Sequence, residues 1–201
     1  MKILGLTGSV GMGKSTAAAM LRRMGVPVYD ADAAVHRMMA KGGSAVAQVA
    51  AAFPGVQKDA AIDRRALGRL VFGNDAAMKR LEGIIHPLVR CDEDRFLRRM
   101  RRRRARLVVM DVPLLFESGR QRRYDATMVV TAPQFLQRAR VLARPGMTAA
   151  TLAAIKARQM SDAEKRRRAD FLIPSGLGRA LTWRRLRAVL RRFSVDKESR
   201  I

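Results

Sequence analysis

The chain has 201 residues, 48% of them hydrophobic, which is enough to bury the core of one domain with or without insertions. No stretch approaches the roughly 18 apolar residues that a membrane-spanning helix needs, and the start of the chain lacks the apolar segment of a secretory signal. Cys91 is the only cysteine, which excludes a disulfide scaffold and indicates a reducing compartment. We therefore expect a cytoplasmic protein with no membrane partner.

The 41 Lys and Arg residues outnumber the 17 Asp and Glu residues, and the formal net charge is +24. Such an excess can indicate a nucleic-acid partner. Seven of the nine residues 98–106 are arginines, but the excess persists when this run is set aside. Aromatic residues make up 5% of the chain and do not alternate with the arginines, so no base-stacking surface is indicated. We interpret the run as a solvated helix face and do not expect a nucleic-acid partner, while phosphate-rich ligands would also account for part of the charge.

The first predicted element is a buried strand over the apolar segment Lys2 to Leu6. Gly8 to Ser15 then reads G-x-x-x-x-G-K-S, the pattern of a phosphate-binding loop. Its glycines let the backbone curl so that N–H groups point at phosphate oxygens, and the helix predicted through Ala17 to Leu21 presents its positive end to the same anion. In this motif Lys14 reaches the β- and γ-phosphates and the Ser15 hydroxyl binds Mg²⁺. The pattern therefore predicts a site for a nucleoside triphosphate and magnesium.

Apolar strand patterns alternate with helical patterns along the rest of the chain. A turn and a second strand are predicted over 25–30, and three more strands at 107–111, 126–131 and 171–173. Helices are predicted at 31–39, over most of 45–106, and at 148–160, 162–169 and 179–192, with a further helix that begins at Pro133. Glycine and proline predict helix breaks at 41–44, 53–55, 72–75 and 86–87, and Asp63 is a predicted N-cap. Residues 197–201 are predicted to form a polar tail.

Strands that alternate with helices indicate a parallel sheet covered by helices on both faces. Ligands of such sheets bind at the carboxyl ends of the strands. Asp30 and Asp32 after the second strand, and Asp111 at the end of the third, should therefore converge near the phosphate-binding loop. The guanine-binding motif N-K-x-D and the switch motif D-x-x-G are absent, which argues against a GTPase, and the chain is too short for a motor or a large ATPase. A small phosphotransferase remains, and such enzymes close a lid over the phosphates.

Longer motifs accompany the loop. The segments are Asp30-Ala31-Asp32, Ile85-His86-Pro87 and, from Asp111 to Glu117, D-V-P-L-L-F-E. Further along come Gln137, Arg140 and Arg144 ahead of Gly146-Met147-Thr148, and then Gln159-Met160, Lys165 and Ala169-Asp170. In these motifs and in the loop sequence from Leu6 to Thr16, the chain resembles the dephospho-coenzyme A kinase family over nearly its full length.

The chain departs from the family pattern at three places. Ser9 and Met12 stand where the family more often has Gly and Ser, but the loop pattern fixes neither position, so phosphate binding should survive. Ile173 to Gly176 reads I-P-S-G where the family often has I-x-N-x-G near the adenine, which leaves the contacts to the base open. The arginine run 98–106 has no counterpart in the family pattern.

The resemblance implies an α/β P-loop kinase with a five-stranded parallel sheet flanked by helices, a helical substrate-binding insert and a lid. We expect a nucleotide-binding core at 1–31, 107–136 and 170–201, a CoA-binding insert at 32–106 and a lid at 137–169. The implied reaction is the ATP-dependent, magnesium-assisted phosphorylation of the ribose 3′-hydroxyl of dephospho-CoA, the last step of coenzyme A synthesis. Its products are coenzyme A and ADP.

Four residues are predicted to be catalytic. Asp32 is expected to orient and deprotonate the 3′-hydroxyl, since phosphoryl transfer needs one carboxylate on the nucleophile. The alternatives are that Asp32 caps a helix or that Asp30 is the base. Lys14 would neutralise phosphate charge. Arg140 and Arg144, four residues apart on one helix face, are expected to stabilise the transferring phosphoryl group, unless they are ordinary solvated arginines.

The remaining candidates bind rather than react. The predicted nucleotide contacts are Gly11, Met12, Gly13, Lys14, Ser15, Thr16 and Gly176. Ser15 and Asp111 are predicted to hold Mg²⁺, Asp111 through water, unless Asp111 merely ends a strand. The resemblance adds His86, Leu115, Phe116 and Glu117 to Asp32 around the acceptor substrate. Taken alone, Leu114, Leu115 and Phe116 look like core residues, and His86 looks like a helix-end residue.

Two other functions stay open from the sequence. Another small-molecule P-loop kinase, of the nucleoside monophosphate, shikimate or gluconate type, would share the loop and the lid but not the P-L-L-F-E motif. An ATP-dependent nucleic-acid-binding module would account for the charge. Neither the oligomeric state nor the nucleotide preference follows from the residues.

Overall fold

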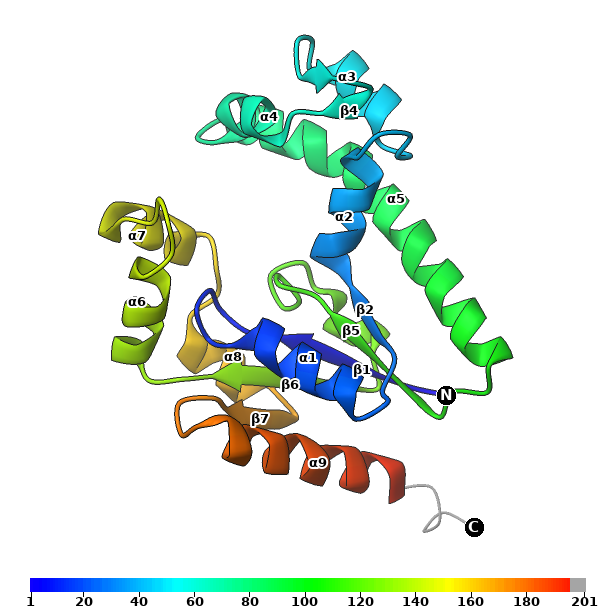
Figure 1. Ribbon diagram of the computed structural model, residues 1–201, viewed down its shortest axis with the longest axis vertical. Coiled ribbons are helices and arrows are strands. Elements are labelled where there is room, and N and C mark those ends of the chain that lie inside the picture. Colours follow the sequence, from blue (N-terminus) through cyan, green and yellow to red (C-terminus); the bar gives the residue numbers. More distant parts are fainter. Residues whose placement is uncertain (196–201) are drawn as a thin grey trace. The chain divides into compact units, whose positions relative to one another are not determined.

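The computed structural model describes residues 1–195, so the predicted tail 197–201 lies outside the described residues. The chain divides into two compact units (Figure 1). The first unit comprises Met1–Tyr29 and Met100–Ile201, and the second comprises Asp30–Arg99. Each unit is described by itself.

A five-stranded sheet organises the first unit, in the order β2-β5-β1-β6-β7. Its strands are β1 (Lys2–Thr7), β2 (Val28–Asp30), β5 (Leu107–Asp111), β6 (Ala126–Thr131) and β7 (Phe171–Pro174). The pairings of β1 with β5, of β1 with β6 and of β6 with β7 are parallel. The predicted α/β fold with five strands is confirmed, and the long apolar runs explain why, since a central parallel strand is buried on both faces.

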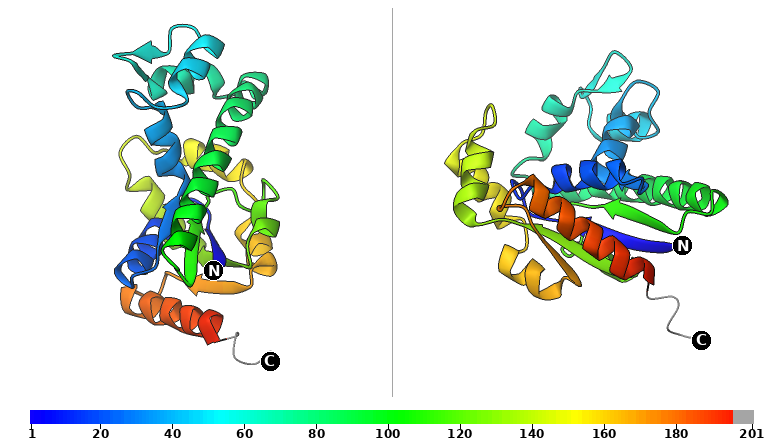
Figure 2. Two further views of the ribbon diagram at one scale, coloured as in Figure 1. Left: turned by 90° about the vertical axis from the view of Figure 1, so that its right-hand side faces the viewer. Right: turned by 60° about the horizontal axis from the view of Figure 1, so that its bottom comes forward.

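Helices cover both faces of this sheet. α1 (Lys14–Arg23) and α9 (Arg179–Val195) pack together on one face, where Leu4 and Leu6 of β1 join Leu21 and Leu186 in one buried cluster. α8 (Asp162–Arg168) contacts β6, and Figure 2 shows it on the opposite side of the strands from α1. Because side chains alternate along a strand, β1 can serve both layers.

The segment from β6 to β7 carries three of the helices. They are α6 (Gln134–Leu142), α7 (Ala149–Ala157) and α8. Pro133, predicted as a residue of the first turn, immediately precedes α6 as its N-cap residue, and the Thr148 side chain accepts a hydrogen bond from the Thr151 N–H to cap α7. A short 3-10 helix, η1 (Arg120–Arg123), lies between β5 and β6. None of the helices among residues 1–195 is long and apolar enough to cross a membrane.

The second unit is mostly helical. It contains α2 (Ala31–Met39), α3 (Val46–Ala52), α4 (Arg64–Val71) and α5 (Asp75–Arg102), whose last turn extends beyond the unit. The breaks predicted at 41–44, 53–55 and 72–75 fall between these helices. The predicted cap at Asp63 is confirmed, because its carboxylate accepts from the N–H groups of Arg65 at 2.8 Å and Ala66 at 3.1 Å.

Two sequence predictions in the second unit are wrong. The first is the helical pattern expected between the break at 53–55 and Asp63, where the chain forms a hairpin of β3 (Gln57–Lys58) and β4 (Ala61–Ile62). The second is the break at 86–87, because α5 continues through Pro87. Pro87 and Gly83, whose carbonyl it deprives of a partner, are both exposed, so water can take the place of the lost hydrogen bond.

Candidate active site

The phosphate-binding loop connects β1 to α1. Gly11 and Gly13 adopt φ angles of 76° and 86°, in the left-handed region that favours glycine. Gly13 precedes α1 without a side-chain hydrogen bond to cap the helix. The first N–H groups of a helix have no partner within it, so those of α1 are available to an anion at this end.

Ser9 and Met12, the two unusual loop residues, turn their side chains into the protein. Met12 is 1% exposed, and its sulfur accepts a hydrogen bond of 3.1 Å from the Ala132 N–H. Ser9 is also buried, and its carbonyl accepts from the Met12 N–H at 3.1 Å. Neither side chain therefore extends into the solvent, and phosphate binding by this loop stays a prediction.

Lys14 and Asp111 meet at the carboxyl edge of the sheet. Asp111 pairs with Leu6 in the register of β1 and β5, which brings the end of β5 beside the loop. The Lys14 ammonium lies 2.6 Å from the Asp111 Oδ1, and the two side chains are 15% and 3% exposed. In this arrangement the loop lysine is held by a carboxylate at the place where the motif positions phosphate oxygens.

Magnesium fits the residues at this edge. Ser15 is exposed at the first turn of α1, and the Asp111 carboxylate lies on the neighbouring strand. Within residues 1–195, no group of three or more His, Cys, Asp or Glu side chains could hold a metal. A nucleotide-bound Mg²⁺ does not require such a group, because it keeps several waters and takes only one or two protein ligands beside the phosphates.

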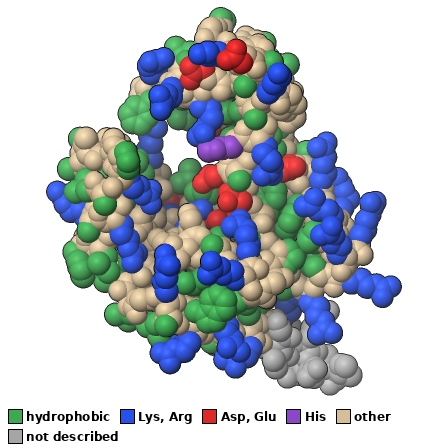
Figure 3. Space-filling view, in the orientation of Figure 1, with side chains coloured by type: hydrophobic (Ala, Val, Ile, Leu, Met, Phe, Trp, Pro, Cys, Tyr) green, Lys and Arg blue, Asp and Glu red, His purple; other side chains and the backbone are tan. Residues whose placement is uncertain are grey.

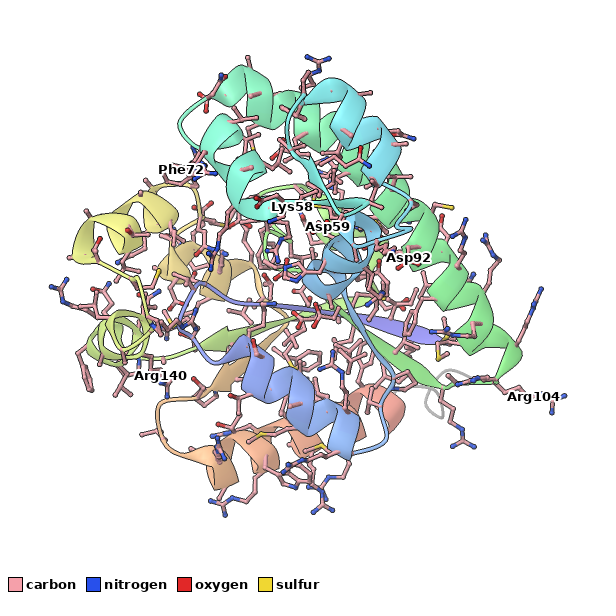
Figure 4. The ribbon with its side chains drawn as sticks, turned by 45° about the horizontal axis from the view of Figure 1, so that its top comes forward. Lys58, Asp59, Phe72, Asp92, Arg104 and Arg140 are labelled. Carbon is pink, nitrogen blue, oxygen red and sulfur yellow. The ribbon has the colours of Figure 1, made fainter. Side chains whose placement is uncertain are left out.

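Arg140 lies beside the phosphate-binding loop. It extends from α6 and is labelled in Figure 4. Its guanidinium donates to the Ser175 carbonyl at 2.9 Å and to the Ser175 hydroxyl at 3.1 Å. That hydroxyl in turn donates to the Met12 carbonyl at 2.6 Å. Ser175, at the position where the family often has asparagine, therefore connects Arg140 to the loop.

Gly176 follows in the same segment. A Cβ atom placed on it would lie 2.7 Å from the Pro133 ring, so glycine permits the close approach of this segment to the start of α6. Arg144 lies just beyond the end of α6 and is exposed, and its guanidinium makes no hydrogen bond or ion pair among residues 1–195. The two arginines share one predicted role but differ in their surroundings, since only the Arg140 side chain is held beside the loop.

The P-L-L-F-E segment contributes mainly to the interior of the first unit. Leu115 and Phe116 are 0% and 4% exposed, the burial typical of core residues, whereas Leu114 is 42% exposed. Glu117 accepts a hydrogen bond of 2.8 Å from the Met160 N–H, and the same oxygen lies 2.8 Å from the ammonium of Lys165. The interpretation of Leu114 as a core residue, which the apolar run alone suggests, is therefore wrong.

The other predicted residues belong to the second unit. Asp30 is the N-cap of α2, since its carboxylate accepts from the Ala33 N–H at 2.9 Å. Asp32 lies exposed in the first turn of α2, so the alternative that Asp32 itself caps the helix is wrong. His86 is exposed on α5. These positions leave the carboxylate of Asp32 free of any capping duty.

Sequence reasoning gave no role to two glutamines that contact the loop. The Gln137 amide donates to the Val10 carbonyl at 2.8 Å, and the Gln159 side-chain oxygen accepts from the Val10 N–H at 3.1 Å. Both residues stood in the motifs that the family resemblance used, but their spacing alone did not indicate what they contact.

Proteins described as dephospho-CoA kinases match most of the chain. A family model described as dephospho-CoA kinase matches residues 2–177. The dephospho-CoA kinase of Paramagnetospirillum magneticum is 67% identical over 166 residues, covering 83% of this chain and 78% of the relative. That of Rhodospirillum rubrum is 57% identical over 189 residues, covering 94% of this chain and 90% of the relative.

Solved structures agree in fold. A crystal structure of a Thermus thermophilus protein covers 95% of this chain and 97% of its own, with a TM-score of 0.84 and 38% identity. The match to the dephospho-CoA kinase from Campylobacter jejuni covers 96% of this chain and 97% of that protein, with a TM-score of 0.63 and 23% identity. A shikimate kinase from Acinetobacter baumannii covers 98% and 95%, with a TM-score of 0.53 and 13% identity. The last two similarities concern the fold alone.

Proposed function

The chain belongs to the dephospho-CoA kinase family, and we propose that it transfers the γ-phosphoryl group of ATP to the ribose 3′-hydroxyl of dephospho-CoA. The products are coenzyme A and ADP. The observation that carries the proposal is the phosphate-binding loop with the Lys14–Asp111 pair at its open end, in a chain with the family's D-A-D and P-L-L-F-E motifs.

The donor nucleotide binds through the loop. The N–H groups at the start of α1 and the concave backbone from Gly11 to Thr16 receive the phosphates, and Lys14 moves from Asp111 to the β- and γ-phosphates. Gly176 contacts the nucleotide near its adenine base. Ser15 would hold Mg²⁺ with its hydroxyl, and Asp111 would hold it through water. The ion, when bound, supplies positive charge that offsets the negative charge of the phosphates.

Two arginines complete the charge around the phosphoryl group. The Arg144 side chain is exposed and has no hydrogen-bond or ion-pair partner among the described residues, so its guanidinium can move to the transferring group. Arg140 already has its guanidinium nitrogen 3.7 Å from the position of a Cβ on Gly13, close to where the phosphates bind. Positive charge at the equatorial oxygens stabilises the transition state of phosphoryl transfer.

The acceptor hydroxyl is activated by Asp32. Its carboxylate is exposed in the first turn of α2, while Asp30 holds the end of that helix. We assign the base to Asp32 for this reason. His86 and Glu117 are proposed substrate contacts, together with the segment of Leu115 and Phe116, although the burial of these two side chains favours a supporting role.

The segments divide the work. The core at 1–31, 107–136 and 170–201 binds the nucleotide, the insert at 32–106 binds the CoA part, and the lid at 137–169 closes over the phosphates. Closure excludes water, which would otherwise hydrolyse ATP. Hydrogen exchange with and without both substrates would show protection in the insert and the lid, and unchanged exchange in both would contradict closure.

An acceptor panel tests the proposed function. ADP formation from ATP and Mg²⁺ is measured with dephospho-CoA, adenosine, AMP and shikimate in parallel. We expect turnover with dephospho-CoA to exceed that with each other acceptor by a large factor. Preferred turnover of AMP or shikimate would replace the proposed function by that of another small-molecule kinase, and turnover that requires DNA or RNA would indicate a nucleic-acid-dependent ATPase.

A further inference from the structure

Both backbone polar groups of Val10 are held by side chains from the segment between β6 and β7. Gln137, in the first turn of α6, donates to the carbonyl, and Gln159, just after α7, accepts from the N–H. The polypeptide from Gln137 to Gln159 therefore leaves the phosphate-binding loop at Val10 and returns to the same residue. The predicted lid is attached to the loop at both ends of its helical pair.

α6 also packs directly against the loop. A Cβ atom on Gly11 would lie 2.6 Å from the Val141 side chain and 3.0 Å from the Gln137 carbonyl. Gln137 is 3% exposed, so its amide has little access to water and its hydrogen bond to Val10 is the alternative to an unmet donor. Displacing α6 would therefore disturb both the conformation of Gly11 and the carbonyl of Val10.

The end that carries Gln159 is fixed by a buried ion pair. Glu117 accepts from the N–H of Met160, the residue after Gln159, at 2.8 Å. The Lys165 ammonium lies 2.8 Å from the same Glu117 oxygen, and the Lys165 side chain is 0% exposed. Glu117 thus connects the segment that follows β5 to Met160, the residue beside Gln159. Lys165 of α8 holds Glu117 in place through the ion pair.

We propose that Gln137 and Gln159 are positioning residues that hold the phosphate-binding loop in its nucleotide-binding conformation through the two backbone groups of Val10. Glu117 and Lys165 hold the Gln159 end of this clamp. These hydrogen bonds fix the peptide groups of Val10 directly before Gly11 and Gly13, the glycines with positive φ in the loop. The two glutamine contacts deepen the proposed function. Of the measurements below, only the KM values rest on that function.

Gln159 offers the sharper test, because its side chain is only partly buried and its substitution can be matched. Gln159→Met replaces the amide oxygen with a sulfur that accepts only weakly, at similar length, and Gln159→Glu keeps an acceptor oxygen. Gln134→Met is the control, since Gln134 is an exposed residue of α6 three positions before Gln137. A single neutral hydrogen bond is worth about a three- to tenfold effect on an equilibrium.

We expect Gln159→Met to speed hydrogen exchange at the Val10 N–H by about three- to tenfold and to raise the ADP dissociation constant and the KM for ATP by a similar factor. The KM for dephospho-CoA and the melting temperature should stay near the wild-type values. Gln159→Glu should restore slow Val10 exchange, which is read in place of affinity because an added carboxylate repels nucleotide.

Wild-type exchange at Val10 in Gln159→Met, or wild-type ADP affinity in that variant, would overturn the proposal. Fast exchange in Gln159→Glu would also overturn it, since the acceptor would then not be the relevant feature. Gln137→Glu removes the donor instead of the acceptor, because a carboxylate facing the Val10 carbonyl cannot donate a hydrogen bond. We expect faster hydrogen exchange at the Val10 N–H in this variant as well. Exchange and ADP binding need no acceptor substrate, so failure of this inference is distinct from failure to phosphorylate dephospho-CoA.

Discussion

Lys14 is the residue on which the nucleotide site depends most. Its ammonium faces Asp111 at 2.6 Å, and the loop pattern directs it to the phosphates once a nucleotide is bound. We predict that Lys14→Ala lowers kcat by about 100-fold or more, the effect of losing one preorganised donor to the transition state. The melting temperature should also fall, because a buried carboxylate loses its cation. Circular dichroism must confirm the fold at the assay temperature, and retention of more than about a tenth of the rate would contradict this role.

Asp32 and Asp30 have separable roles. Asp30 caps α2, whereas Asp32 is exposed and makes no cap. We predict that Asp32→Asn lowers turnover by about 10²- to 10⁴-fold, as expected for the loss of a general base, with ATP affinity and melting temperature nearly unchanged.

Asp30→Asn is the matched control, because asparagine caps a helix about as well as aspartate. It should leave turnover and stability close to wild type. Near-normal turnover in Asp32→Asn, together with a large loss in Asp30→Asn, would reverse the assignment of the base.

Asp63 gives the insert a pH-dependent cap. Hydrogen bonds from the backbone N–H groups of Ala66 and Arg65 lower the pKa of Asp63 below its ordinary value of 3.8. The folded protein thus binds this proton less readily than the unfolded chain does. The stabilisation is complete above the unfolded pKa and is lost as the pH falls through the lowered folded pKa.

We therefore predict that Asp63→Asn caps α4 without this acid dependence. Melting curves of wild type and Asp63→Asn between neutral pH and pH 3 would differ only at the acid end. Parallel melting temperatures over that whole range would show that the charge of Asp63 has no part in the cap.

At the scale of elements, the Glu117–Lys165 pair joins the segment after β5 to α8. Both partners are largely buried, and Lys165 is 0% exposed. Removing one partner of a buried pair leaves an uncompensated charge, at a cost of about 3–5 kcal/mol. We predict this loss of unfolding free energy for Lys165→Met, and a smaller loss for the double variant Lys165→Met with Glu117→Gln. Denaturant titrations measure both values, and equal losses in the single and double variants would argue against coupling of the two charges.

The elements that the sequence predicted well are those with a strong local pattern. β5 and β6 occupy the predicted 107–111 and 126–131, because continuous apolar runs of that length fit buried strands. The hairpin of β3 and β4 was missed because its turn residues, Asp59 and Ala60, adopt positive φ without the glycine that usually marks such a turn. At Pro87 a local rule failed, since the buried residues Ile85 and Val89 on either side keep α5 packed through it.

The candidate site divides in the same way. The loop, Lys14 and the strand-end Asp111 could be predicted, because a fixed spacing and the parallel sheet together bring them to one edge. The partners of Val10 could not be predicted, since a hydrogen bond to a backbone group 127 or 149 residues away leaves no local pattern, and the same holds for Ser175, whose partners lie 35 and 163 residues away. The cap at Asp30 was also ambiguous, as two aspartates stand within three residues at the start of α2.

For the molecule as a whole, the net charge of +24 is spread rather than gathered. Lys and Arg side chains occur over much of the face shown in Figure 3, and the arginines of 98–106 are all exposed. Arg104 extends outward past the end of α5 in Figure 4. Exposed charges of this kind attract anions from a distance and are screened by salt. The distribution fits a solvated surface and does not by itself define a nucleic-acid site.

The proposed reaction, phosphorylation of the ribose 3′-hydroxyl of dephospho-CoA, can be tested by locating the transferred phosphoryl group on the product. Wild-type protein is incubated with ATP, Mg²⁺ and dephospho-CoA, and the product is assigned by phosphorus and proton nuclear magnetic resonance, with Lys14→Ala as the matched blank. We predict one new phosphomonoester on the ribose 3′-oxygen, formed in step with ADP and absent from the blank. A phosphoryl group on any other oxygen, or ADP formed with dephospho-CoA unchanged, would contradict it.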